Sequence, residues 1–209
     1  MSSRSRAALS LVVADGHREV SDTELAGALM AGEDWALTET WQRFGPMVLM
    51  TAERTLGSRT ESEDAAQETF IRVFRIVKRL REPARLRSFV YSVAVRTLRS
   101  HLRHRRLRAW LSFAAPESLV EAAHFTVDFE SRARLRRFYA LLDRLSARDR
   151  LVFVLRRVEE MSIEEIASTM GISASTVKRS LIHASERLSA WLDADTPVAR
   201  SFQGRSRAP

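Results

Sequence analysis

The sequence contains no cysteine and little glycine or proline. The absence of cysteine excludes disulfides, thiolate catalysis and cysteine-ligated zinc sites. Only 7 Gly and 5 Pro occur in 209 residues, which favours helices over strands joined by turns. No apolar run approaches the roughly 18 residues that a membrane-spanning helix needs. The run from Leu9 to Ala14 is too short for a signal peptide, so we expect a cytoplasmic protein.

Lysine is nearly absent as well, although the chain is strongly basic. Lys78 and Lys178 are the only lysines, so 32 of the 34 basic residues are arginine. The formal net charge is +8. An excess of this size indicates a polyanionic partner, either nucleic acid or an acidic membrane surface. A G+C-rich genome would explain the use of arginine in place of lysine, but it would not explain where the arginines cluster.

Apolar residues recur at steps of three and four along most of the chain, and no strand-like alternation persists, which predicts an all-α fold. Capping boxes are expected to open three of the helices, because each partner satisfies a free backbone amide of the other. The boxes are Ser21 with Glu24, Thr60 with Glu63, and Ser162 with Glu165. Gly57 and Gly171 are expected to end helices.

Weak periodicity around Pro116 divides the predicted helices into two small domains. We expect the first domain over residues 21–111 and the second, with a helix-turn-helix, over residues 129–192. A linker over residues 112–128 would join them. Flexible tails are expected over residues 1–20 and 193–209.

The spacing Ala167-x3-Gly171-x5-Val177 is that of a helix-turn-helix. Glycine permits a positive φ in the turn, and the valine packs the second helix against the first. The exposed positions of that second helix suit phosphate and base-edge contacts in a major groove. They are Ser173, Ser175, Thr176, Lys178, Arg179, His183 and Arg187. An ordinary helical hairpin with a solvated polar face is the alternative.

Residues 83–116 contain no Asp or Glu but hold eight arginines, with aromatic residues and two histidines among them. A basic helix with aromatic side chains suits single-stranded or melting DNA, because cations bind the backbone while flat rings stack on bases. His101 and His104 could share a metal ion, but no nearby acid or cysteine completes such a site, so no metal is expected. We also find no nucleophile with an acid or metal cluster, as a nuclease or recombinase would need.

Three segments in order resemble extracytoplasmic-function sigma factors of bacterial RNA polymerase. Residues 63–74, EDAAQETFIRVF, resemble the helix that binds core polymerase. Residues 86–106, beginning LRSFVYSVA, resemble the helix that melts the promoter and reads its −10 element. Residues 145–188, beginning LSARDR, resemble the domain that reads the −35 element.

The resemblance implies a role for each group of residues. Polymerase contacts would fall to Asp64, Gln67, Glu68, Phe70, Val73 and Phe74. Contacts to the −10 element would fall to Arg87, Tyr91, Arg96, Arg99, His101, Arg103 and Arg106, with a flipped base held near residues 78–86. Contacts to the −35 element would fall to the seven helix-turn-helix residues named above.

The resemblance also implies partners and a mode of control. They are core RNA polymerase, promoter DNA and an anti-sigma factor that keeps the protein inactive until a specialised regulon is needed. No cofactor, small-molecule substrate or enzymatic activity is implied, and the protein is not itself expected to be embedded in a membrane. Two sites depart from the family pattern: Glu160 stands where the family often has glycine, and Arg156-Arg157 replace a commonly aromatic site.

Other functions make different predictions. A stand-alone helix-turn-helix regulator would bind duplex DNA without polymerase, usually as a dimer on two half-sites, and it would have no use for the motif at residues 63–74. An enzyme acting on nucleic acid would need a catalytic cluster. A protein that only titrates a partner would typically carry a receiver domain.

Overall fold

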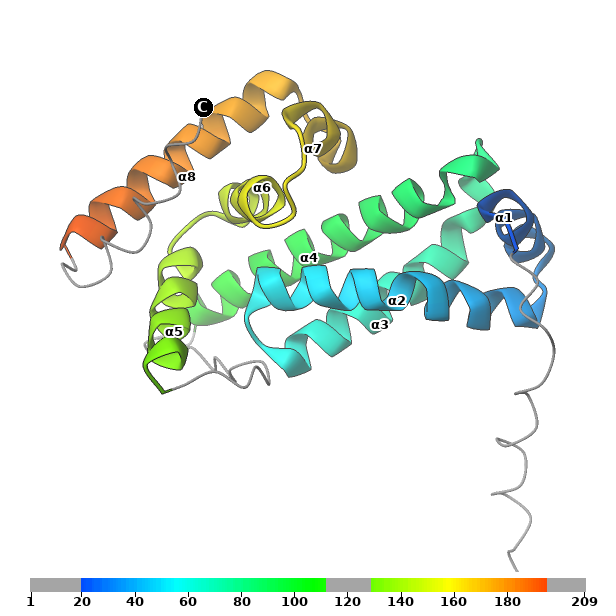
Figure 1. Ribbon diagram of the computed structural model, residues 1–209, viewed down its shortest axis with the longest axis horizontal. Helices are drawn as coiled ribbons and strands as arrows, with labels where there is room; N and C mark the ends of the chain where they lie inside the picture. The colour runs from blue at the N-terminus through cyan, green and yellow to red at the C-terminus, as the bar shows by residue number, and fades with distance from the viewer. Residues whose placement is uncertain (1–19, 112–128, 195–209) are drawn as a thin grey trace, which may run out of the picture.

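The computed structural model describes residues 20–111 and 129–194 of the chain, and every regular element in these two ranges is helical (Figure 1). The predicted all-α fold is therefore confirmed. The predicted linker, residues 112–128, lies outside the described residues, as do nearly all residues of the two predicted tails. The last helix extends to Ala194, two residues beyond the predicted end of the second domain.

The first domain consists of four α-helices and two short 3-10 turns. Their bounds are α1 Asp22–Ala31, α2 Asp34–Leu56, α3 Arg59–Ile76, η1 Val77–Arg79, η2 Pro83–Arg85 and α4 Leu86–Leu111. Helices α2, α3 and α4 pack side by side, and α1 covers one end of them (Figure 1). Their apolar faces enclose a core that includes Leu25, Phe44, Phe70, Val73 and Val90.

Local capping places most of these helix ends where the sequence predicts them. Ser21 and Glu24 form the predicted capping box, with Ser21 N–H donating to Glu24 at 2.9 Å. The predicted box at Thr60 is wrong, because α3 begins earlier, at Arg59, with Ser58 as its N-cap. Gly57 adopts φ 73°, and this left-handed turn brings Ser58 directly into the capping position.

The second domain consists of four further helices. Their bounds are α5 Phe129–Asp143, α6 Ala147–Arg157, α7 Ile163–Met170 and α8 Ala174–Ala194. The predicted capping box of Ser162 and Glu165 opens α7, and Gly171 ends it at φ 64°. Val177 is fully buried against Ile166, so α7 and α8 form the predicted helix-turn-helix.

Glu160, in the turn between α6 and α7, has φ 56°. It is the only non-glycine residue with a positive φ among the described residues. L-residues avoid this left-handed region because Cβ approaches the following carbonyl oxygen. The structure thus gives a physical reason why glycine suits this position, and Glu160 holds it under strain.

The two domains pack directly against each other (Figure 1). One apolar cluster contains Leu56 and Leu98 from the first domain together with Leu151, Leu155 and Ile166 from the second, all at most 1% exposed. Helix α4 contacts both α6 and α7, and the C-terminal half of α2 contacts α6. We call this contact the seam.

Candidate nucleic-acid interface and partner-binding face

The outward face of α3 carries part of the predicted polymerase-binding set. Asp64 and Gln67 are exposed, and Glu68 is half-buried. Phe70 and Val73, in contrast, are 2% and 0% exposed and lie in the core of the first domain. Phe74 is half-buried against that core. In this structure the polar members of the set and the exposed part of Phe74 can touch a partner directly, whereas Phe70 and Val73 can act only by holding α3 in place.

Two apolar residues on this face were missed by the sequence analysis. Ile71 is 51% exposed and follows Gln67 by four residues, so both lie on the same side of α3. Trp41 of α2 is 48% exposed, and its ring packs against Phe70 at an interplanar angle of 58° with centroids 4.7 Å apart. The available signal was position, because Ile71 falls on the same side of α3 as the polar residues Asp64 and Gln67, at steps of seven and four residues.

Helix α4 presents a stripe of arginines to solvent. Arg96, Arg99, Arg103 and Arg106 follow one another at steps of three and four, so they lie along one side of the helix; Arg99 is half-buried and the other three are exposed. None of the four has an ion-pair partner within residues 20–111 and 129–194. Arg87 is exposed near the start of the same helix. We call the four residues the basic stripe; it is the largest unneutralised cationic feature of α4.

The other two predicted −10 residues are engaged inside the protein. His101 contacts Glu68 of α3, with Nε2 and Oε2 2.6 Å apart. Burial alone would raise the pKa of Glu68, but this contact and Arg72 outweigh it and lower the pKa. Tyr91 packs into the apolar seam, where burial raises its pKa to about 12 despite a hydrogen bond with Thr51.

Helix α8 turns the predicted −35 residues outward. Ser173 caps the helix by accepting from the Thr176 amide at 3.3 Å. Ser175, Lys178, Arg179, His183 and Arg187 are exposed, and Thr176 is half-buried. Ile182 is 58% exposed on the same surface and was missed, although it lies four residues after Lys178 and three after Arg179 on the polar side of α8. An exposed apolar side chain there suits the methyl group of thymine.

A buried carboxylate fixes the orientation of His183. Asp149, 4% exposed in α6, lies 3.0 Å from His183 Nδ1. Burial alone would raise the pKa of Asp149, but hydrogen bonds from Ser146, Ser180 and His183 outweigh it and hold the pKa below its ordinary value. The contact ties α8 to α6, so the exposed face of α8 has a defined direction.

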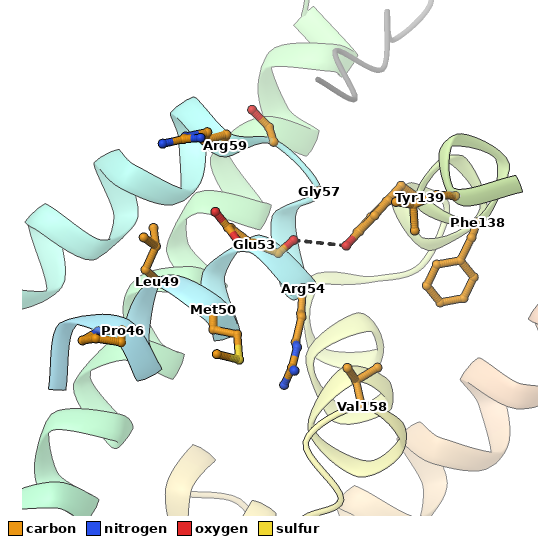
Figure 2. A pocket seen from close by; sticks show the side chains of 12 residues that line it. Pro46, Leu49, Met50, Glu53, Arg54, Gly57, Arg59, Phe138, Tyr139 and Val158 are labelled. Atoms are coloured by element: carbon orange, nitrogen blue, oxygen red, sulfur yellow. Dashed lines mark hydrogen bonds between the residues drawn. The ribbon is translucent and has the colours of Figure 1, made fainter. Parts of the chain in front are cut away.

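A groove of about 680 Å³ opens along the seam (Figure 2). The end of α2 forms one wall and α5 and α6 the other, with Met50, Phe138 and Val158 as apolar lining. Tyr139 lines the groove and donates a hydrogen bond across it to the carbonyl of Glu53 at 3.1 Å.

Across residues 20–111 and 129–194 no helix is long and apolar enough to cross a membrane. The same ranges contain no cluster of three or more potential metal ligands.

Comparisons with known proteins agree with this arrangement. The family model for Sigma-70 region 2 matches residues 40–108, and that for Sigma-70, region 4 matches residues 135–188. Ferric citrate uptake sigma factor FecI of Escherichia coli is 32% identical, over 64% of this chain and 77% of FecI. ECF RNA polymerase sigma factor SigM of Mycobacterium tuberculosis is 27% identical, over 85% of this chain and 87% of SigM.

The fold is similar to that of CnrH, whose structure was solved in complex with the cytosolic domain of CnrY. The TM-score is 0.56 at 25% identity, covering 84% of this chain and 99% of that one. Two regions of one family thus match in order along the chain, on the helices that carry the basic stripe and the helix-turn-helix. The chain belongs to the sigma-70 family of bacterial RNA polymerase sigma factors, in its extracytoplasmic-function group.

Proposed function

We propose that this protein starts transcription by bringing core RNA polymerase to promoters through three surfaces. The exposed face of α3 binds the polymerase, the basic stripe of α4 binds the −10 element, and α8 binds the −35 element. The observation that carries the proposal is the basic stripe, because four aligned arginines without acidic partners in the described structure form a surface that suits a polyanion. We assign the polymerase-binding domain to residues 21–111 and the −35 domain to residues 129–192.

The polymerase-binding surface we propose is narrower than the sequence motif. Asp64, Gln67 and Ile71 share the exposed side of α3, and Trp41 lies beside them. Such a patch combines an apolar centre with acidic and amide groups at its edge, as protein interfaces commonly do. Phe70 and Val73 support the surface from beneath.

At the −10 element, the basic stripe tracks the backbone of the separated strand, with Arg87 at one end. Each phosphate that an arginine neutralises releases counterions, so binding here weakens steeply with salt. Extruding a base costs a few kcal/mol, and stacking it on a protein ring recovers roughly 1–3 kcal/mol. Promoter melting therefore needs no ATP, and the protein acts as an initiation factor rather than an enzyme, without a cofactor or small-molecule substrate.

At the −35 element, α8 enters the major groove by the side that carries Lys178, Arg179 and Ile182. The side chains of Arg179 and Lys178 suit guanine edges, and Ile182 suits a thymine methyl group. Ser173 and Ser175, at the start of α8, are placed to bind phosphate together with backbone amides of the first turn. His183 is oriented by Asp149 beside this surface.

We further propose that a separate anti-sigma protein controls this factor, and that it works in the cytoplasm. CnrH, its structural neighbour, was solved with the cytosolic domain of CnrY bound. The basic stripe and the exposed apolar residues of α2 and α3 are surfaces that such an inhibitor would cover.

Run-off transcription with purified core polymerase on the promoter of the protein's own operon tests the proposal. A discrete start that requires the protein is expected. The double variant Gln67→Ala, Ile71→Ala should lower both core binding and transcript yield, because it removes exposed contacts without opening the core. Ser189→Ala, an exposed change near the end of α8, is the matched control and should leave both unchanged.

A different result would favour the stand-alone regulator. That protein would yield no transcript with core polymerase, yet would bind duplex promoter DNA tightly by itself in a salt-sensitive manner. In that case Gln67→Ala, Ile71→Ala would bind DNA as well as the parent protein does.

A further inference from the structure

Asp149 lies at the third position of α6, directly after the N-cap residue Ser146 and the first turn begin the helix. Ser146 accepts a hydrogen bond from the Asp149 amide at 3.1 Å and donates its hydroxyl to Oδ2 at 2.7 Å. Glu165 has the equivalent position in α7, where Ser162 is its hydrogen-bond partner. Asp149 differs from Glu165 because it is 4% exposed and also contacts His183 of α8.

The carboxylate of Asp149 decides which ring nitrogen of His183 carries a hydrogen. Burial alone would raise the pKa of Asp149, but hydrogen bonds from Ser146, Ser180 and His183 outweigh it and lower the pKa. The carboxylate is therefore ionised near neutral pH, and an ionised carboxylate can only accept hydrogen bonds. Nδ1 of His183, 3.0 Å from Oδ2, must be the donor. One tautomer of the neutral imidazole is thereby fixed.

The second ring nitrogen of His183, Nε2, is available to a partner outside the protein. The side chain of His183 is 50% exposed, and no residue within 20–111 and 129–194 forms a hydrogen bond with Nε2. His183 follows Arg179 by four residues and precedes Arg187 by four, so all three lie along the exposed side of α8. This is the surface that we propose enters the major groove.

Asp149 is the only charged group in contact with His183 among the described residues. Arg148 of α6 lies 4.0 Å from the other carboxylate oxygen, Oδ1. The remaining charged groups on α8 or packed against it near this position are Arg144, which lies over Trp191, and the exposed residues Arg179, Glu186 and Arg187. None of them competes for Nδ1, so protonating the ring leaves the contact with Asp149 in place and changes only what Nε2 offers.

Nε2 offers opposite hydrogen-bonding chemistry in the two charge states. In the neutral ring with hydrogen on Nδ1, Nε2 accepts, whereas in the charged ring it donates. In the major groove, adenine and cytosine present amino donors, and guanine presents its N7 and O6 acceptors. Histidine side chains commonly change charge between about pH 5 and about pH 8. A histidine held in this way can therefore select different bases within the physiological range.

We propose that His183 is a base-reading residue whose preference depends on its charge, and that Asp149 is the residue that positions it. Neutral His183 selects adenine or cytosine, and charged His183 selects guanine. The promoters that the protein prefers then change with pH. The reading of a promoter base rests on the proposed function, whereas the fixed tautomer rests only on the contacts between α6 and α8.

Heteronuclear NMR of the ring nitrogens in the full-length free protein tests the tautomer. Long-range proton–nitrogen correlations distinguish a protonated from an unprotonated ring nitrogen, and His183→Ala identifies the signals of His183 among the five histidines. At about pH 8 the neutral ring in the parent protein should carry its hydrogen on Nδ1. A mixture of tautomers in the parent would overturn the proposal, and this measurement needs no variant of the buried Asp149.

Asp149→Ala and Glu165→Ala form a matched pair of variants for the same measurement. Each removes the carboxylate from the third position of a helix in the second domain, but only Asp149 contacts His183. Asp149→Ala should give a mixture of both tautomers, and Glu165→Ala should keep the parent tautomer. If Asp149→Ala also keeps the parent tautomer, Asp149 does not position the ring.

Promoter selection by holoenzyme tests the reading of the base. Holoenzyme is mixed with the promoter of the protein's own operon, randomised across its −35 element, and the bound DNA is sequenced at about pH 6 and about pH 8. In the parent protein, one position should change from adenine or cytosine toward guanine as the pH falls, with a change in their ratio of roughly tenfold. His183→Ala should abolish this change, and Glu165→Ala should retain it.

Two results of the selection would refute the reading. One is a base preference that is the same at both pH values, or that changes in His183→Ala as it does in the parent. The other is uniformly tighter binding at the lower pH without a change in base preference, which would assign His183 to a phosphate. Failure of the proposed function is a different result, because run-off transcription by the parent protein would then give no discrete start at either pH.

Discussion

Replacing the strained Glu160 with glycine should stabilise the second domain. A left-handed conformation costs an L-residue roughly 1–2 kcal/mol. Glycine removes that cost but loses roughly 0.5–1 kcal/mol more chain entropy on folding. Glu160 is exposed at φ 56°, and the structure gives its side chain no interaction that would be lost. The balance predicts that Glu160→Gly raises the free energy of unfolding by about 0.5–1 kcal/mol.

Urea denaturation followed by circular dichroism at 222 nm would measure this change. A gain of this size corresponds to a rise of about 1–4 °C in the Tm of a chain this long. Glu160→Ala is the control, since it removes the same side chain but keeps a Cβ in the left-handed region. If Glu160→Gly is no more stable than Glu160→Ala, the turn is not strained and the reasoning is wrong.

Three other perturbations test the core, the DNA surface and the buried carboxylate. Phe70→Ala should cost about 3–5 kcal/mol of stability in chemical denaturation, whereas Ile71→Ala should leave stability nearly unchanged and lower only core-polymerase affinity in a binding titration. Arg103→Ala should reduce the slope of log K against log salt for −10 DNA by about 1, measured by fluorescence anisotropy with holoenzyme. The folded pKa of Asp149 is lowered, so its stabilising contribution is present above its unfolded pKa and lost as the pH falls through the folded value. Urea denaturation from neutral to acidic pH should therefore show a steeper loss of stability for the parent than for Asp149→Asn, and equal slopes would contradict the assignment.

The ends of helices could be predicted from the sequence where a few neighbouring residues decide the capping geometry. The caps at Ser21 and Ser162 and the stop at Gly171 are short-range hydrogen-bond and φ preferences, so their positions followed from sequence. The box at Thr60 was misplaced because Ser58 and Ser62 offered competing polar groups nearby. Which hydroxyl becomes the N-cap depends on where the left-handed Gly57 ends the preceding helix.

The assignment of residues to surfaces was less reliable. A motif marks a helix but not the side from which its partner approaches, so Phe70 and Val73 were grouped with residues that solvent reaches, and Ile71 was omitted. Tyr91 was expected to face DNA but lies in the seam. In α4 the three- and four-residue periodicity of the sequence separates the basic stripe from the apolar side of the helix. The periodicity does not show which other helices pack against that apolar side.

The sequence by itself determined the helices, the caps at Ser21 and Ser162, the helix-turn-helix and the acid-free basic segment, because each depends on residues within a few turns of one another. Only the tertiary structure decided that Arg150 would be buried against the end of α2 and that Gly57 would lie beneath Tyr139. These contacts join residues more than 80 positions apart in the chain. These contacts stabilise the fold because buried donors and acceptors satisfy one another. The sequence around either partner does not show which distant group it will bind.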